Sequence, residues 1–195
     1  MNTFGIGQEY EQMAAKLFAA MGNQVIPMSM FTNNTGDKIA APMIVDADGL
    51  TISPDLLVIG KGKQPFWAEI KQKSIPSYFF KKHRWEHGID SYMAESYKKI
   101  QDESGYFVYI LVYEERSPKT PNLYLDLRQD TSARMIAEND LEKSGLWMVI
   151  SLTQAIKSGE VRPNNDAMKK PHNPEGRGLY WPRFKMKQCF IGESA

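Results

Sequence analysis

Two short strand-like segments joined by a six-residue turn constrain the fold of this chain more than any other feature. Residues 55–59 and 66–71 are rich in aliphatic and aromatic side chains, and residues 60–65 read Gly-Lys-Gly-Lys-Gln-Pro. Glycine and proline between two such segments are typical of a hairpin turn. We therefore predict an antiparallel hairpin over residues 55–71, which brings the polar side chains of its two strands together.

Helical and strand patterns on either side of this hairpin predict an α/β fold. Apolar residues recur every three or four positions over 8–21, which predicts a helix that ends at Gly22. A strand over 24–30 and a hairpin over 44–52 follow. A second helix is expected over 90–102, capped by Asp90 or Ser91 and ended by Gly105, and then a buried strand over 106–113. This order predicts a sheet with helices on both faces.

The remainder of the chain has weaker patterns. We predict strands over 122–127 and 146–152, a helix over 132–143 and a long loop over 163–178, whereas 179–181 and 188–191 carry no clear assignment. Length and composition fit one globular domain over 1–195, with a core at about 7–127 and a C-terminal extension at about 128–195.

Composition also excludes several classes of protein. The single cysteine, Cys189, rules out an internal disulfide and a thiolate zinc cage. The longest strongly apolar run, 106–113, is too short to cross a bilayer, and the first residues lack the basic and apolar regions of a signal peptide. We therefore expect a cytoplasmic protein with no membrane partner.

The hairpin carries the residues with the clearest chemistry. Side chains alternate along a strand, so Glu69 and Lys71 share one face while Ala68 and Ile70 point into a core on the other. The hairpin return brings Asp55 near Glu69. Two carboxylates, water and a backbone carbonyl such as that of Ile70 suit a hard cation like Mg²⁺. Such a cation polarises a phosphodiester, and a neighbouring ammonium stabilises the charge that develops.

These residues resemble the two motifs of the PD-(D/E)XK nuclease superfamily. Pro54-Asp55 matches the first motif and Glu69-Ile70-Lys71 the second. Gly7, Glu11 and Gly22 match a first-helix arrangement that is found in archaeal Holliday-junction resolvases. The resemblance covers residues 7–112. It implies a restriction-endonuclease-like core, in which a mixed central β-sheet is flanked by helices in the order αβββαβ.

The resemblance also implies an activity and a set of site residues. The activity is that of a Mg²⁺- or Mn²⁺-dependent deoxyribonuclease with Lys71 as the catalytic lysine. Asp55, Glu69 and Glu11 would lie around the metal, together with the carbonyl of Ile70, and Glu9 competes with Glu11 for the first-helix position. RNA stays open as a substrate, and a homodimer would suit cleavage of two strands. The alternative is a catalytically silent nucleic-acid-binding protein on the same fold.

Basic residues after the second motif predict a polyanionic partner. Aromatic residues are interleaved with them, and aromatic rings stack on unpaired bases. The candidate nucleic-acid-binding residues are Lys73, Lys81, Lys82, Arg84, Lys98 and Lys99, and the interleaved rings are Tyr78, Phe79, Phe80, Trp85 and Tyr92. A second basic stretch contains Lys169, Lys170, Arg177, Arg183, Lys185 and Lys187.

A rival motif lies within the same segment. Residues 83–87 read His-Arg-Trp-Glu-His, the H-x-x-E-H pattern of a zinc peptidase. On a helix, His83 and His87 would share a face and hold Zn²⁺, with Glu86 as the base. Gly88 follows at once and Pro76 precedes closely, so the segment has little room for a long helix. The zinc peptidase is therefore the weaker alternative.

Overall fold

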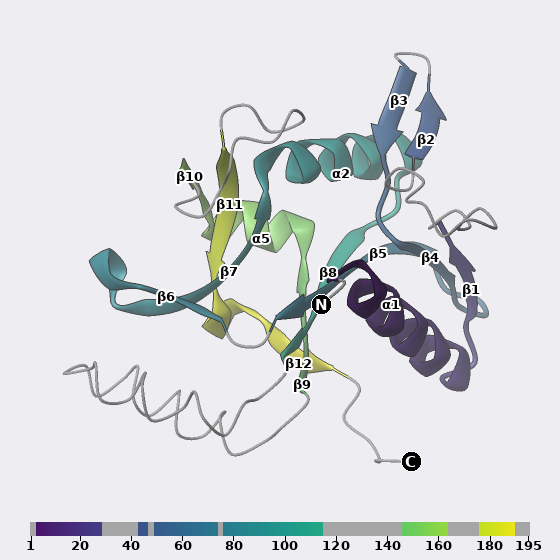
Figure 1. The fold of residues 1–195 in the computed structure, drawn as a ribbon. Coiled ribbons are helices and arrows are strands. Elements are labelled where there is room, and N and C mark those ends of the chain that lie inside the picture. The colour runs from purple at the N-terminus through teal and green to yellow at the C-terminus, as the bar shows by residue number, and fades with distance from the viewer. Residues whose placement is uncertain are drawn as a thin grey trace.

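A mixed six-stranded sheet forms the centre of the molecule (Figure 1). The computed structural model describes residues 3–28, 43–46, 49–73, 76–114, 146–163 and 176–189. In spatial order the sheet consists of β1 (Gln24–Pro27), β4 (Leu56–Ile59), β5 (Phe66–Lys73), β8 (Val108–Glu114), β9 (Leu146–Ser151) and β12 (Lys187–Cys189). The β5–β8 pair is parallel and the other neighbours are antiparallel.

Helices cover both faces of this sheet, as the sequence predicts. Helix α1 (Thr3–Ala20) packs on one face, and helices α2 (Ser91–Ser104) and α5 (Leu152–Ser158) pack on the other. The strands β1, β4 and β5 form an antiparallel meander, and α2 leads from it to the parallel partner β8. The expected order αβββαβ is therefore confirmed, with two further strand pairs inserted along the chain.

The strands outside the central sheet form two smaller sheets. One is the hairpin of β2 (Met43–Asp46) and β3 (Gly49–Ile52), at the place predicted from the sequence. The other is a four-stranded antiparallel sheet in the order β10 (Glu160–Pro163), β11 (Arg177–Pro182), β7 (Arg84–Asp90) and β6 (Ser77–Phe79). Two 3-10 turns, η1 (Phe80–Lys82) and η2 (Arg183–Lys185), follow β6 and β11.

The alternation of β5 divides the core into two clusters. Ala68 and Ile70 pack with Tyr10, Ala14 and Phe18 of α1 on one side of the sheet. On the other side, Trp67 lies in a cluster with residues of α2, α5, β8 and the inner face of the four-stranded sheet. Glu69 and Lys71 share the face of Trp67, so they point towards the α2 side. That face is a second core rather than a solvated strand surface.

The ends of α2 confirm one sequence signal and correct another. Gly105 adopts a left-handed conformation (φ 70°), and its N–H donates to the carbonyl of Gln101, as expected for a helix-ending glycine. Asp90 occupies the N-cap position, but its side chain makes no capping hydrogen bond. At α5, in contrast, the hydroxyl of Ser151 accepts from the N–H of Gln154.

Several predicted boundaries differ from the structure. The strand predicted over 24–30 ends at Pro27, where pairing with β4 stops. The predicted loop 163–178 is shorter, because Pro163 ends β10 and Arg177 begins β11. The predicted strand 122–127 and helix 132–143 lie outside the described residues. None of the helices in the described part of the chain is long and apolar enough to cross a membrane.

Two glycines allow the cost of a close contact to be separated from the cost of backbone strain. A Cβ on Gly88 would lie 2.6 Å from a ring carbon of Tyr180 and 2.8 Å from the carbonyl oxygen of Leu179. A Cβ on Gly105 would meet nothing within 4 Å, although its φ is +70°. We expect Gly105→Ala to cost about 1 kcal/mol through the left-handed backbone alone. Gly88→Ala should cost more, about 1–3 kcal/mol, by overpacking.

Chemical denaturation of the two variants and the wild type checks this prediction. The wild type should have the highest free energy of unfolding, Gly105→Ala a lower one and Gly88→Ala the lowest. If the two variants lost the same free energy of unfolding, the contact between β7 and β11 would accommodate the added methyl group at little cost.

Candidate active site

The hairpin return places Asp55 directly against β5. Leu56 is paired with Ala68, and one residue earlier the Oδ2 atom of Asp55 accepts a hydrogen bond of 2.7 Å from the backbone N–H of Ile70. The backbone carbonyl of Asp55 accepts from the N–H of Met28, also at 2.7 Å. Asp55 is buried, with 9% of its surface exposed. Its carboxylate is therefore held at one position beside the second motif.

Glu69 and Lys71 meet on the α2 side of β5. Lys71 forms an ion pair with Oε1 of Glu69, and Tyr97 on α2 is close enough that burial and then the charge of Glu69 raise the pKa of its hydroxyl. Glu69 is 1% exposed, while the Lys71 side chain is 30% exposed. The Oε2 atom of Glu69 accepts no hydrogen bond from any described residue. A buried carboxylate oxygen without a donor is costly unless something else binds it.

The charges of Asp55, Glu69 and Lys71 shift the pKa values of Asp55 and Lys71. Burial raises the pKa of Asp55 well above its usual value, and the charges of Glu69 and Glu11 raise it further; Lys71 and the Ile70 N–H oppose this. Burial alone would lower the pKa of Lys71, but Glu69 and Asp55 outweigh burial and raise it. Lys71 is therefore firmly protonated, and Asp55 is the carboxyl group that ionises with difficulty.

The first helix contributes one carboxylate to this environment. Glu11 on α1 is partly exposed, and its charge is one of the causes of the raised Asp55 pKa. Glu9 is exposed and is not among those causes. Of the two residues that the sequence left in competition, Glu11 is the one that acts on Asp55.

The donor set fits a hard divalent cation. Among the described residues no three His, Cys, Asp or Glu side chains gather closely enough to enclose a metal ion. Asp55 and Glu69 nevertheless converge, and Glu69 presents a buried oxygen without a protein donor. Mg²⁺ is usually bound by one or two carboxylates and keeps several waters, so it does not need a closed protein cage. A cation here would also favour the ionised form of Asp55.

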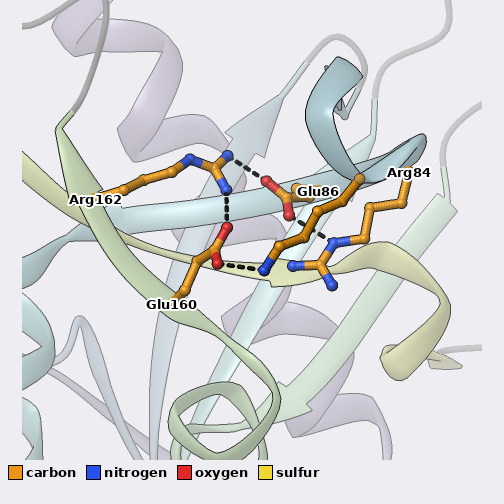
Figure 2. Close-up of polar contacts among 5 residues, drawn as sticks. Arg84, Glu86, Glu160 and Arg162 are labelled. Carbon is orange, nitrogen blue, oxygen red and sulfur yellow. Dashed lines mark hydrogen bonds and ion pairs between the residues drawn. The ribbon is translucent and has the colours of Figure 1, made fainter.

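The predicted nucleic-acid-binding residues lie on β5, around η1 and on α2. Lys73 and Lys81 are exposed. Lys82 is paired with Glu160, and Arg84 with Glu86. Figure 2 shows the Arg84–Glu86 pair and also Arg162, which was not among the predicted residues, paired with both glutamates. On α2, Lys98 pairs with Asp102, and Lys99 lies 3.9 Å from Glu103. The Lys98–Asp102 pair is exposed, and an exposed ion pair contributes little to stability.

The zinc-peptidase alternative is wrong. Residues 84–90 form strand β7, so the helix that the motif requires is absent from this described segment. His83 lies before the strand with a left-handed backbone, and its side chain is exposed. His87 is buried and makes a 2.7 Å hydrogen bond with Glu114. The two histidines therefore do not share a ligand site.

A buried ion cluster that the sequence did not indicate joins the two larger sheets. Arg183 donates from Nε and Nη2 to the two carboxylate oxygens of Glu114, at 2.7 and 2.6 Å. Burial would raise the pKa of Glu114, but His87 and Arg183 lower it to about 2. Burial lowers the pKa of His87, so the imidazole is neutral at pH 7. Only the pairing of distant segments brings these three residues together.

Two further residues near the sheet have shifted pKa values. Tyr97 is buried on α2, and burial together with the charge of the nearby Glu69 raises the pKa of its hydroxyl. Cys189 lies partly buried on β12, and burial raises the pKa of its thiol to about 12. A protonated thiol is a poor nucleophile, which agrees with a structural role for Cys189.

The comparisons with known proteins do not assign a function to this chain. No protein-family model matches the chain, and no curated protein matches its sequence. Among solved structures, a Holliday junction resolvase from the archaeal hyperthermophile Archaeoglobus fulgidus aligns with a TM-score of 0.46 and 10% sequence identity. The alignment covers 94% of this chain and 91% of the resolvase. The function proposed below rests on the chain's own site.

The raised Asp55 pKa predicts a stability change that depends on pH. In the metal-free protein Asp55→Asn should raise Tm at about pH 8, because the amide still accepts from Ile70 N–H and removes a buried charge. Asp55 has a higher pKa folded than unfolded, so its stabilising contribution is lost as pH rises through the folded pKa. The gain should therefore vanish near pH 4. A gain on the order of 2–4 °C is expected for each kcal/mol.

Glu69→Gln provides the contrast for this measurement. Glu69 has Lys71 and Tyr97 as partners, so neutralising it removes an ion pair and should not raise Tm. Thermal melts in EDTA at several pH values test both variants. A lower Tm for Asp55→Asn at every pH would identify Asp55 as a structural carboxylate.

Proposed function

We propose that this chain is a metal-dependent deoxyribonuclease of the PD-(D/E)XK type, which hydrolyses phosphodiester bonds with Asp55, Glu69 and Lys71. The observation that carries the proposal is the convergence of the two motifs: Asp55 accepts from the N–H of Ile70, between Glu69 and Lys71. Two carboxylates and one lysine, two of them buried, meet at one edge of the hairpin. Charges are costly to bury, and such an arrangement is common at catalytic sites.

Each residue has a role that follows from its position. Asp55 and Glu69 would hold a Mg²⁺ or Mn²⁺ ion, with the carbonyl of Ile70 and with Glu11 at the border of the site. The bound ion supplies Lewis-acid polarisation of the phosphodiester and lowers the pKa of a water. The buried Tyr97 would orient Glu69. The Lys71 side chain is 30% exposed, and its ammonium can stabilise the charge that develops on the phosphate.

DNA is the proposed partner, with RNA as the competing substrate. The exposed Lys73 continues the face of Glu69 and Lys71 along β5, so a phosphate backbone could follow this edge. A homodimer with two opposed sites would allow both strands of a duplex to be cut. The protein would act in the cytoplasm.

A cleavage assay with matched variants tests the activity. Plasmid, linear duplex, single-stranded and four-way-junction DNA are incubated with and without Mg²⁺ or Mn²⁺. Asp55→Asn, Glu69→Gln and Lys71→Ala should each lose about 10²-fold or more in rate, because each removes a group that acts on the transition state. Glu11→Gln should lose less. The exposed residues Glu95 and Lys63 give matched controls, Glu95→Gln and Lys63→Ala, which should cleave normally.

The same assay separates the nuclease from its alternative. Binding without cleavage under every metal condition would leave the silent nucleic-acid-binding protein as the better description. Cleavage that survives in all three site variants would move the active site elsewhere.

Metal binding should depend on pH through Asp55. The raised pKa means that part of the Asp55 population is protonated before the ion binds, so binding must release a proton. Apparent Mg²⁺ affinity should therefore rise with pH through the folded pKa of Asp55 and then level off. Calorimetric titration in buffers of different ionisation enthalpy measures the proton count, and Asp55→Asn is the control. An affinity that stays constant from about pH 4 upwards would contradict Asp55 as a ligand.

A further inference from the structure

Two short turns present the same pair of features at the protein surface. Phe80 in η1 is 64% exposed and is followed by Lys81 and Lys82. Phe184 in η2 is 59% exposed and is followed by Lys185, whose ammonium lies 5.3 Å from the Phe184 ring centroid. Single exposed apolar residues are common on proteins. A phenylalanine next to lysine on two separate turns combines a stacking surface with phosphate-binding charge.

The strand register places both turns at the same end of the four-stranded sheet. Glu86 of β7 is paired with Ser77 of β6 on one side and with Pro182 of β11 on the other. From this row, β6 runs on to η1 and β11 runs on to η2. Both neighbours are antiparallel to β7, so the two turns leave the sheet in the same direction. Phe80 and Phe184 therefore lie at the same end of the four-stranded sheet.

Ion pairs connect the strands of the four-stranded sheet next to η1. Arg162 donates to Glu86 and Glu160, Arg84 donates to Glu86, and Lys82 is paired with Glu160 (Figure 2). The Arg162 guanidinium also lies between two rings, 3.7 Å from the centroid of Phe79 and 4.1 Å from that of Tyr180. At the tip, His83 has a φ of 46°, which is uncommon for a residue other than glycine. The hairpin thus holds Phe80 outward in a fixed, strained turn.

Turn η2 is tied to the strand edge that continues from the candidate active site. Arg183, its first residue, makes the paired hydrogen bonds to Glu114, and Glu114 is in register with Lys73. Lys73 lies two residues beyond Lys71 on the same strand face, roughly 7 Å along β5. A nucleic-acid strand whose phosphate lay at Lys71 would therefore reach Lys73 and then the η2 turn within a few nucleotides.

We propose that η1 and η2 form a binding surface for nucleic acid with unpaired bases, in which Phe80 and Phe184 stack on bases while Lys81 and Lys185 contact phosphates. A phenyl ring reads no base edge, so this surface gives no sequence preference. It favours bases whose faces are open, as in flaps, gaps, single strands and branch points, over a fully stacked duplex. The proposal rests on the proposed function for its ligand and adds the structural class of the substrate.

Binding measurements in Ca²⁺ test the proposal without any need for cleavage. Fluorescence anisotropy compares a flapped duplex, a single strand and a fully paired duplex of equal length. Phe80→Ala with Phe184→Ala should weaken binding to the first two by roughly tenfold or more and leave duplex binding almost unchanged. Phe80→Trp and Phe184→Trp should keep the preference. Phe107→Ala is the matched control, because Phe107 is 51% exposed outside both turns.

A second readout reports stacking directly. A 2-aminopurine placed at the unpaired position should be quenched by the wild type and less by Phe80→Leu with Phe184→Leu, which keeps apolar bulk but removes the ring. Equal loss for paired and unpaired substrates, or no loss, would overturn the proposal. So would a double variant that only changes the oligomeric state, since the surface would then bind a second copy of the chain. If wild type shows the binding preference but never cleaves, the nuclease fails and this surface stands.

Discussion

The pairing of β5 with a strand on each edge is the constraint on which the rest of the structure depends. The antiparallel partner β4 pairs with residues 66–68 of β5 and the parallel partner β8 pairs with residues 67–73, so β5 lies in the middle of the sheet. Its two faces then pack against α1 and against α2 with the four-stranded sheet. A strand in this position cannot shift by one residue without moving Ile70 out of one core and Trp67 out of the other.

The candidate site exists because the backbone hydrogen bonds between β4 and β5 end next to Asp55, whose carboxylate takes the place of a backbone carbonyl. Beyond the pair of Leu56 and Ala68, the N–H of Ile70 is bound by a side chain rather than by a backbone carbonyl. This hydrogen bond places Asp55 beside Glu69 in a buried environment, where the two carboxylates repel each other and Lys71 and the Ile70 N–H offset part of the repulsion. A fold arranged for stability alone gains little from such a pair, and a bound cation would turn the repulsion into attraction.

The molecule contains two buried groups of charged residues that have different roles. The cluster of Glu114, His87 and Arg183 is satisfied by its own members and joins the central sheet to the four-stranded sheet. The cluster of Asp55, Glu69 and Lys71 keeps an oxygen that has no donor among the described residues. Satisfied networks fix a packing arrangement, whereas an unsatisfied one at an accessible edge points to a ligand. This difference distinguishes the structural cluster from the candidate active site although both are buried.

The sequence by itself determined the features that depend on near neighbours in the chain. The alternation over residues 66–71 assigned Glu69 and Lys71 to one face, the glycines of 60–65 gave the hairpin, and Gly105 gave the end of α2. Since a hairpin register follows from its turn, the approach of Asp55 to Glu69 could also be predicted. These signals are local, because backbone sterics and side-chain periodicity act over a few residues.

The tertiary structure alone decided what depends on contacts between distant segments. The H-x-x-E-H sequence is compatible with a helix, yet pairing with β11 makes it a strand and buries His87 against Glu114. In the same way, Tyr97 comes near Glu69 only when α2 packs on the sheet, and Phe184 lies at the same end of the four-stranded sheet as Phe80 only through the register of β7. Long-range pairing outweighs local propensity, and the choice of which distant segments pair leaves no periodic signal in the sequence.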